Sequence, residues 1–350
     1  MSRGVALFVL AVLASGAPAS GGALPSPVPG LQYRMDKVAD GVYCAVATGV
    51  PYTISNAVVI VGDDGVAVVD PGVGPDEARV LLAAIRTVTG RPVRYVIDTH
   101  FHFDHAFGSK AFAGAVVIGH DATRGMLGGD ALQQRTAAGF VAGLPAQVEK
   151  ARADAAHERD ATKRADLERG ATALETYRKE MAGLRLIPPS LTFDDRMTLW
   201  LGAREIRLLQ LGRGHTAGDV VVLLPRERVL CSGDLFNGYI GYMGDAYADE
   251  WADTLGRLAV LDFDTVIPGH GAPFRGKDAI APVQACLRDI WRQAETLKGA
   301  GVPPDEAARR IDLRAHAGRF PRFSEAGFEP LAVRRIYEVI DGRAAKPAGG

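Results

Sequence analysis

Three histidines and one aspartate lie within six residues, directly after an apolar run. Residues 99–105 carry the pattern H-x-H-x-D-H, and residues 93–97 before them are apolar enough to predict a buried strand. His100 and His102 are two residues apart, so their side chains lie on the same side of an extended chain. Imidazole and carboxylate groups together are typical ligands of zinc and similar divalent metals. We therefore expect a fold that brings the end of a strand to a metal site.

Three later segments repeat one arrangement, in which an apolar strand is followed by glycine and then by a ligand-type residue. A glycine at that position lets the backbone turn tightly and approach a metal closely. Because every ligand follows a strand, we expect all of them along one edge of the fold. Five imidazoles and two carboxylates are too many for one tetrahedral zinc and suit two metals. The seven candidates are His100, His102, Asp104, His105, His215, Asp234 and His270.

The rest of the pattern is a series of strands followed by helices, repeated twice. This order predicts an α/β (α+β) fold, a four-layer αββα sandwich in which two sheets pack face to face. Asp63, Asp64 and Gly65 between β-branched runs predict a hairpin. Strands are expected at residues 37–50, 54–61, 66–69, 93–97, 115–118, 191–193, 197–201, 205–211, 219–224, 228–231 and 265–267, and helices at 76–87, 249–261, 277–298, 303–314 and 330–340.

Residues 123–186 differ in character from the rest. Ala, Glu, Lys and Arg dominate residues 147–185, which predicts one or two solvent-exposed helices with Gly170 as a break. Two interpretations stay open, a solvated insertion and a lid over the site. We expect a main domain at residues 31–298 that includes this helical insertion, followed by C-terminal helices and a tail at 299–350.

The N-terminal segment has the order of a secretory signal peptide. Arg3 precedes an apolar run at residues 5–13, and small residues follow, including Ala17 and Ala19. The run is short for a bilayer span, although an uncleaved anchor is the alternative. We expect a signal peptide at residues 1–20, a flexible linker at 21–30, and an exported protein, periplasmic or secreted, without an integral membrane segment after signal removal.

Net charge and cysteine content limit the kinds of partner and cofactor site that we expect. The 350 residues carry a formal net charge of −1, so nothing favours nucleic acid as a partner, and we expect a small-molecule substrate. The three cysteines, Cys44, Cys231 and Cys286, are too few and too scattered for a disulfide framework. The sequence contains no C-x-x-C pair, so we expect no thiolate zinc site.

In their order, H-x-H-x-D-H, G-H-T, G-D and G-H resemble the motifs of the metallo-β-lactamase superfamily, over about residues 38–290. The resemblance implies an αββα sandwich with zinc as cofactor, two ions per chain. One metal would be held by His100, His102 and His215, the other by Asp104, His105 and His270, and Asp234 would bridge them. A metal-bound hydroxide, oriented by Asp104, would then attack the carbonyl carbon or the phosphorus of the substrate. The metals would polarise the oxygen bonded to that atom.

Four further residues are candidates around this site. Asp70 matches the family's strand-end aspartate, which supports the histidine loop from behind, although a simple turn aspartate explains it equally well. Asn237, Tyr239 and Tyr242 follow Asp234 on a glycine-rich loop, where they either contact substrate or shape the loop.

The superfamily contains β-lactamases, thioesterases, lactonases, sulfatases, nucleases and redox enzymes. We expect an exported zinc-dependent hydrolase of a small ester, thioester, lactone or amide. A β-lactamase is the first alternative, because residues 241–246 and Trp251 are similar to a segment of those enzymes, although Leu235, Phe236 and Asn237 include no lysine for the drug's carboxylate. A mono-iron persulfide dioxygenase-like enzyme and a non-catalytic binding module are the others.

Overall fold

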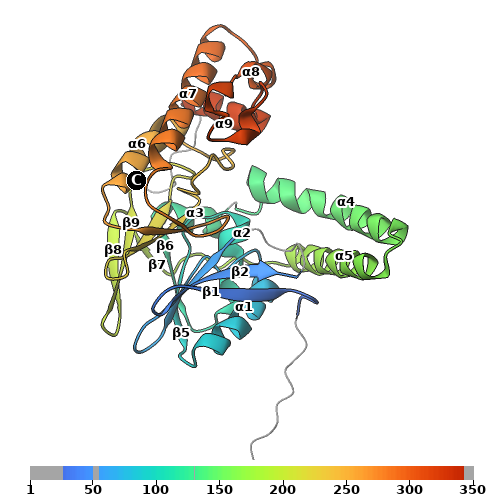
Figure 1. The fold of residues 1–350 in the computed structure, drawn as a ribbon, viewed down its shortest axis with the longest axis vertical. Helices are drawn as coiled ribbons and strands as arrows, with labels where there is room; N and C mark the ends of the chain where they lie inside the picture. The colour runs from blue at the N-terminus through green and yellow to red at the C-terminus, as the bar shows by residue number, and fades with distance from the viewer. Residues whose placement is uncertain (1–26, 50–54, 130, 343–350) are drawn as a thin grey trace, which may run out of the picture.

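Two β-sheets packed face to face form the centre of the molecule (Figure 1). The computed structural model describes residues 27–49, 55–129 and 131–342. The first sheet has seven strands in chain order: β1 (Gln32–Ala39), β2 (Val42–Thr48), β3 (Ala57–Val61), β4 (Val66–Val69), β5 (Val93–Ile97), β6 (Val116–His120) and β7 (Leu191–Phe193). The second has the order β13 (Phe274–Arg275), β12 (Thr265–Pro268), β11 (Val229–Gly233), β10 (Val220–Leu224), β9 (Arg204–Gln210) and β8 (Arg196–Leu201).

The first sheet opens with two hairpins. The sequence led us to expect one strand at residues 37–50, of which residue 50 lies outside the described residues. The chain instead reverses between β1 and β2 at Gly41 (φ +66°), a left-handed conformation that glycine adopts without strain. The hairpin between β3 and β4 is confirmed, and it is closed by the N–H of Gly62, which donates to the carbonyl of Gly65 at 2.9 Å.

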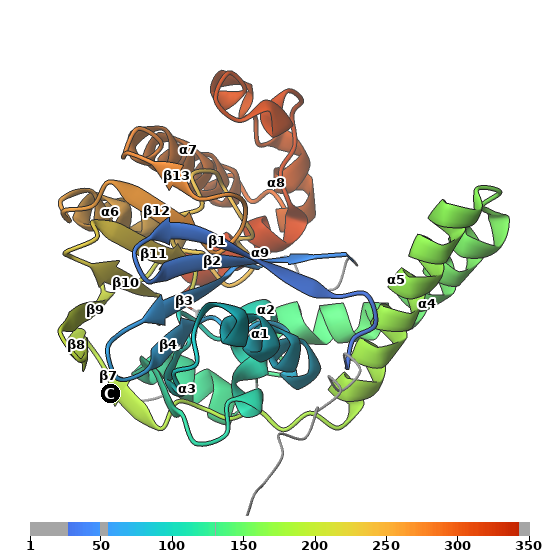
Figure 2. The ribbon, with the colours of Figure 1, turned by 60° about the horizontal axis from the view of Figure 1, so that its bottom comes forward.

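Helices cover the outer face of each sheet, which confirms the αββα arrangement (Figure 2). On the first sheet lies α1 (Pro75–Val88), which begins with proline and two acidic residues and buries Leu81 and Ile85 against the strands. On the second sheet lie α6 (Ala248–Ala259) and α7 (Ile280–Gly299). The smaller helices at the strand ends are α2 (Phe103–Ala106), η1 (Phe107–Ala111) and α3 (Asp121–Gly128).

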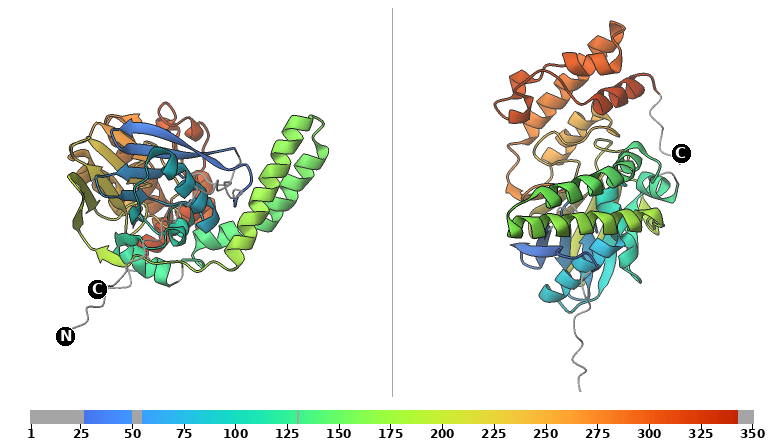
Figure 3. Two further views of the ribbon diagram at one scale, coloured as in Figure 1. Left: turned by 90° about the horizontal axis from the view of Figure 1, so that it is seen from below. Right: turned by 90° about the vertical axis from the view of Figure 1, so that its right-hand side faces the viewer.

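The insertion is a helical hairpin that projects from the side of the sandwich (Figure 3). It consists of α4 (Arg135–His157) and α5 (Ala161–Ala182), so helix begins well before residue 147 and continues through Pro145. The expected break at Gly170 is wrong, because this glycine is buried inside α5. The helices instead separate at residues 158–160, where Asp160 caps α5 by accepting the N–H groups of Thr162 and Lys163.

The C-terminal segment shares its hydrophobic core with α6 and α7. It contains α8 (Pro304–Arg310), η2 (Arg314–His316), η3 (Pro321–Phe323) and α9 (Pro330–Ile340), and Ala307, Ile311 and Ile336 are fully buried there. The expected signal peptide, most of the linker and the final tail lie outside the described residues. Among the helices that are described, none is long and apolar enough to cross a membrane.

Strand direction determines where the candidate ligands lie. β4, β5 and β6 run parallel to one another, as do β11 and β12, so within each sheet their carboxyl ends meet at one edge. Asp70 follows β4, His100 follows β5, Asp234 follows β11 and His270 follows β12.

Candidate metal centre

The histidine motif changes from extended chain to helix in the middle. His102 has extended geometry (φ −63°, ψ 150°) and precedes α2, so Asp104 and His105 lie on the first turn of a short helix. The carbonyl of His105 accepts the N–H of Gly72 at 3.1 Å, which fastens this turn to the loop after β4. Four donors from seven residues thereby face one small, buried volume.

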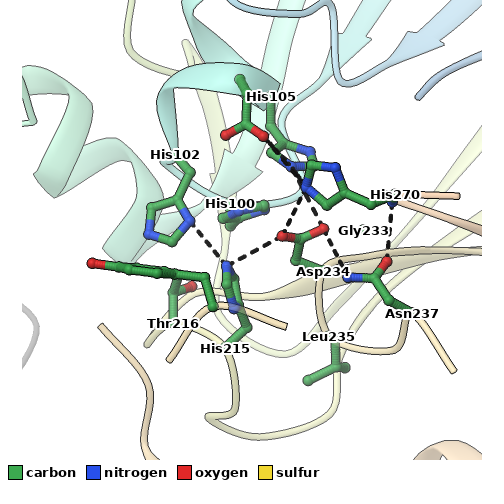
Figure 4. Close-up of polar contacts among 12 residues, drawn as sticks. His100, His102, His105, His215, Thr216, Gly233, Asp234, Leu235, Asn237 and His270 are labelled. Atoms are coloured by element: carbon green, nitrogen blue, oxygen red, sulfur yellow. Dashed lines mark hydrogen bonds and ion pairs between the residues drawn. The ribbon is translucent and has the colours of Figure 1, made fainter. Parts of the chain in front are cut away.

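The structure brings together all seven sequence-predicted metal ligands. Figure 4 labels all of them except Asp104. Donor atoms of His100, His102 and His215 lie within 4.8 Å of one another. Those of Asp104, His105 and His270 form a second such group. These are the two sets that the family resemblance implies.

Asp234 lies between the two groups. One of its oxygens is 3.5 Å from His215 Nε2 and 3.2 Å from His270 Nε2, and the other is 3.6 Å from His105 Nε2. Gly269 makes this approach feasible, since a Cβ there would lie 2.2 Å from Asp234 Oδ1. The carboxylate can therefore contact cations on both sides.

Asp70 fixes two of the imidazoles. Its Oδ2 lies 2.8 Å from His105 Nδ1 and accepts the hydroxyl of Thr99 at 2.8 Å, while Thr99 Oγ1 lies 3.0 Å from His100 Nδ1. Because a carboxylate only accepts, His105 is protonated on Nδ1; because the Thr99 proton goes to Asp70, His100 donates from Nδ1 as well. In both rings Nε2 is then the nitrogen that faces the centre. Asp70 has φ +54°, a strained conformation for a residue other than glycine.

Asp245 does the same for His102, and sequence reasoning gave it no role. Its Oδ2 lies 2.9 Å from His102 Nε2, which leaves Nδ1 facing His215 Nε2 at 2.9 Å. Asp245 lies in the segment that is similar to β-lactamases, and that similarity was the available signal.

Asn56 was also missed. Its side-chain amide donates to the carbonyls of Pro268 (2.9 Å) and Gly271 (2.7 Å), on either side of His270, and its own N–H donates to the carbonyl of Gly269 at 2.7 Å. Because Asn56 is a single asparagine outside any motif, the sequence alone does not indicate that it holds the loop of His270.

The three loop residues proposed as substrate contacts have different surroundings. Asn237 is buried, and it donates to Asp234 Oδ1 at 3.2 Å and accepts the N–H of His270 at 3.1 Å. Tyr242 packs its ring against His102 and His215, with centroids 5.8 and 6.4 Å apart. Tyr239 is 40% exposed, so of the three it is the most accessible to a ligand.

Burial and charge set the protonation of the centre. Burial lowers the pKa of His215 to about 3 and, aided by the nearby imidazoles, holds the pKa of His100 well below its usual value. Burial also acts on His105, but Asp104, Asp234 and Asp70 outweigh it and raise its pKa to about 10. His100 and His215 in the first group are thus neutral imidazoles, and the second group is rich in carboxylate charge.

The residues fit a pair of divalent cations. His100 Nε2 is buried and has no hydrogen-bond partner among the described residues, although its other nitrogen is held by Thr99. A buried acceptor left bare is costly unless a ligand uses it. Imidazoles beside carboxylates, with His100, His102 and His105 oriented from behind, are the donor chemistry that zinc prefers.

The comparisons with known proteins agree with this geometry. The model of the "Metallo-beta-lactamase superfamily" matches residues 50–270. A linear primary-alkylsulfatase from Pseudomonas sp. (strain ATCC 19151) is 26% identical over 302 residues, which is 79% of this chain and 53% of that protein. A type 2 metallo-beta-lactamase from Elizabethkingia meningoseptica is 29% identical over 85 residues, 23% of this chain and 34% of that enzyme. The chain thus spans about half the length of the alkylsulfatase and about a third of the type 2 enzyme.

Among solved structures, a metallo-beta-lactamase from Pontibacter korlensis superposes with a TM-score of 0.52 and 19% identity, over 73% of this chain and 99% of that one. Fold and site together define an αββα protein of the metallohydrolase type, with its donors at one edge of the sandwich. The chain belongs to the metallo-β-lactamase superfamily.

Proposed function

We propose that this superfamily hydrolase uses two zinc ions to cleave a small ester, thioester, lactone or amide. The observation that supports the proposal most strongly is the complete set of seven donors in two groups that share Asp234. A binding module without catalysis has no need of such a set, so its intactness favours an enzyme.

His100, His102 and His215 would hold the first zinc, and Asp104, His105 and His270 the second, with Asp234 between them. When bound, the metals would supply Lewis acidity and lower the pKa of a water molecule towards neutrality. Asp104 lies 3.3 Å from His270 Nε2 and 3.5 Å from His105 Nε2, so its carboxylate is placed to orient the attacking water. Asp70 and Asp245 keep the histidine nitrogens aimed inward.

The deciding experiment is a substrate panel on one zinc-loaded preparation. Nitrocefin, a homoserine lactone, a thioester, a phosphodiester and dodecyl sulfate would be compared, beside metal analysis of the same sample. We expect close to two zinc ions per chain and turnover of at least one ester-type substrate. One tightly bound iron with oxygen uptake would contradict the proposal in favour of the dioxygenase, and metal without any turnover would favour the binding module.

His102→Ala is the matching variant. Its ring nitrogen belongs to the first group, so we expect hydrolysis to fall to background while the circular dichroism spectrum is kept. His157→Ala removes an exposed imidazole on α4 that belongs to neither donor group and serves as the control. Activity retained in His102→Ala would remove this residue from the site.

An alkyl sulfate ester is a second candidate substrate. The similarity to the alkylsulfatase covers 79% of this chain and so extends beyond residues 50–270, which the family model matches. Release of sulfate from dodecyl sulfate, without hydrolysis of the lactone or thioester, would favour this candidate. Hydrolysis of nitrocefin would favour the β-lactamase instead.

We also propose that the protein is exported. The basis is Arg3, the apolar run at residues 5–13 and the small residues after it. Mass spectrometry of the mature protein should give an N-terminus near residue 20, whereas an intact Met1 in the cytoplasm would contradict export.

A further inference from the structure

The root of the α4–α5 hairpin contacts the histidine loop at two points. Thr136, the second residue of α4, is hydrogen bonded to Asp245 Oδ2, the oxygen that also faces His102 Nε2. One turn further along α4, Phe140 stacks on Phe103 with ring centroids 4.3 Å apart and an interplanar angle of 17°. Phe103 lies between two candidate ligands, so the hairpin supports this loop directly.

The Thr136 hydroxyl has a defined direction. The Thr136 hydroxyl donates to the carboxylate oxygen of Asp245, and a threonine has a single hydroxyl proton. That proton therefore goes to Asp245. The hydroxyl of Tyr242, 3.1 Å from Thr136 Oγ1, is then left to donate to the threonine oxygen.

This chain of contacts ends on a ligand nitrogen. Tyr242 is bonded to Thr136, and Thr136 holds Asp245. Asp245 accepts from His102 Nε2, and His102 Nδ1 faces the first donor group. A carboxylate that loses one of its two supports gains rotamer freedom, and it then fixes the ring of His102 less well. Glycine at position 244 leaves room for the Tyr242 side chain, because a Cβ at that position would clash with the Tyr242 ring.

We propose that Thr136 is a positioning residue for the metal centre, through which the inserted hairpin orients Asp245 and thereby His102. The inference rests on the metal centre proposed above and deepens it. It assigns the root of the insertion to the site, while most of the side chains near the hairpin tip, at residues 150–169, are exposed to solvent.

The test compares zinc affinity, measured by competition with a chromophoric chelator on the whole chain. Thr136→Val keeps the shape and removes the hydroxyl, and Thr136→Ser restores the hydroxyl without the methyl group. Asp245→Asn removes the charge that His102 contacts. Thr172→Val, at an exposed position of α5, is the control because that hydroxyl donates to the carbonyl of Glu168 within the same helix.

We expect the zinc affinity of the first site to fall about 10- to 100-fold in Asp245→Asn, as is typical when a ligand loses its outer partner. Thr136→Val acts one step further out, so we expect a loss of about 3- to 10-fold, with a shifted cobalt absorption spectrum. Thr136→Ser and Thr172→Val should match the wild type.

Zinc affinity and cobalt spectrum of Thr136→Val equal to those of the wild type would overturn the inference, as would an equal loss in Thr136→Ser. Because these measurements need no substrate, a chain that binds zinc normally but hydrolyses nothing would contradict the proposed activity and leave the positioning role intact. A wild-type chain that binds no zinc would overturn both.

Discussion

At the scale of single residues, the orientation of three of the histidines depends on a group behind the ring. Asp70 and Asp245 select which ring nitrogen of His105 and His102 carries the proton, and Thr99 does so for His100. The other ring nitrogen of each of these three histidines is thereby directed at the centre. The candidate ligands and their supports form one network, so the supports influence affinity as the ligands do.

Asp70→Asn tests this network. Asparagine tolerates the left-handed backbone at this position, but its amide offers one acceptor oxygen where the carboxylate serves Thr99 and His105 with two. We expect zinc affinity to fall about 10- to 100-fold with the fold retained, measured by chelator competition. Asp64→Asn, at an exposed ion pair with Arg94, should leave affinity unchanged. An unchanged affinity in Asp70→Asn would show that Asp70 is a simple turn residue.

Sequence reasoning found the residues that belong to motifs and missed those that act alone. The ligands could be predicted because strand, glycine and ligand recur together. Asn56, Thr136 and Asp245 could not be assigned roles, since each contacts its partner only after the chain has folded. Asn56, for example, holds a carbonyl 212 residues away. A local sequence pattern cannot predict a contact between residues so far apart in the chain.

At the scale of elements, the hairpin is attached at both helices. α5 ends against α1, where Glu180 Oε1 accepts the N–H of Asp76 at 2.7 Å, and Tyr177 is buried beside the loop after β4. The insertion was correctly predicted to be helical, but its start, its break and its attachment were not. Periodicity indicates that a helix forms, whereas the contacts at its two ends depend on tertiary neighbours.

Glu180 predicts a pH dependence of stability. Burial raises the pKa of its carboxyl from the ordinary 4.5 to about 7, although the N–H of Asp76 and the charges of Arg79 and Lys110 oppose this. The folded state therefore binds this proton more tightly than the unfolded chain does, and ionisation destabilises the fold as pH rises from about 4.5 to 7.

Glu180→Gln should accordingly raise the melting temperature at pH 8 and have little effect near pH 4.5, because the amide stays neutral and can still accept from Asp76. Thermal unfolding at both pH values measures the difference. Glu168→Gln, on the exposed surface of the same helix, should behave as the wild type at each. A stabilisation of the same size at both pH values would show that the effect is not due to ionisation.

At the scale of the whole molecule, the C-terminal helices contact the loop that carries Asp245. Arg335 of α9 is 9% exposed, and its Nε donates to the carbonyl of Ala246 at 3.0 Å, next to Asp245. Its guanidinium also lies 4.7 Å from the centroid of the Tyr247 ring. Arg135 at the start of α4 pairs with Glu338 of α9 at 2.7 Å, so hairpin, loop and C-terminal helices meet at one place.

Adjacent arginines on α9 provide a matched pair of variants. Arg335→Met leaves the carbonyl of Ala246 without its charged donor, and we expect a loss of about 2 kcal/mol in the free energy of unfolding. Arg334→Met removes an exposed pair with Asp305 and should lower the free energy of unfolding much less. Urea denaturation measures both. Equal values would mean that the contact with Ala246 contributes no more than a surface ion pair.

The αββα class was predictable, since it follows from strand and helix periodicity over many residues. The shared core of α7, α8 and α9 was not, because it joins segments that the sequence separates by turns and glycines. The domain boundary that we expected at residue 298 corresponds to a change in the sequence pattern. The hydrophobic core contains residues from both sides of this boundary.

The position of Asn56 has a consequence for the growing chain on the ribosome. Its amide and N–H hold the loop that carries His270, more than 200 residues later, and β12, which delivers that loop, pairs in parallel with β11. A nascent chain that has emerged as far as residue 260 contains every donor of the first group but lacks His270. The second group can therefore form only after His270 has been synthesised and its loop has been joined to Asn56. A chain with both metal sites filled must have been translated beyond residue 270.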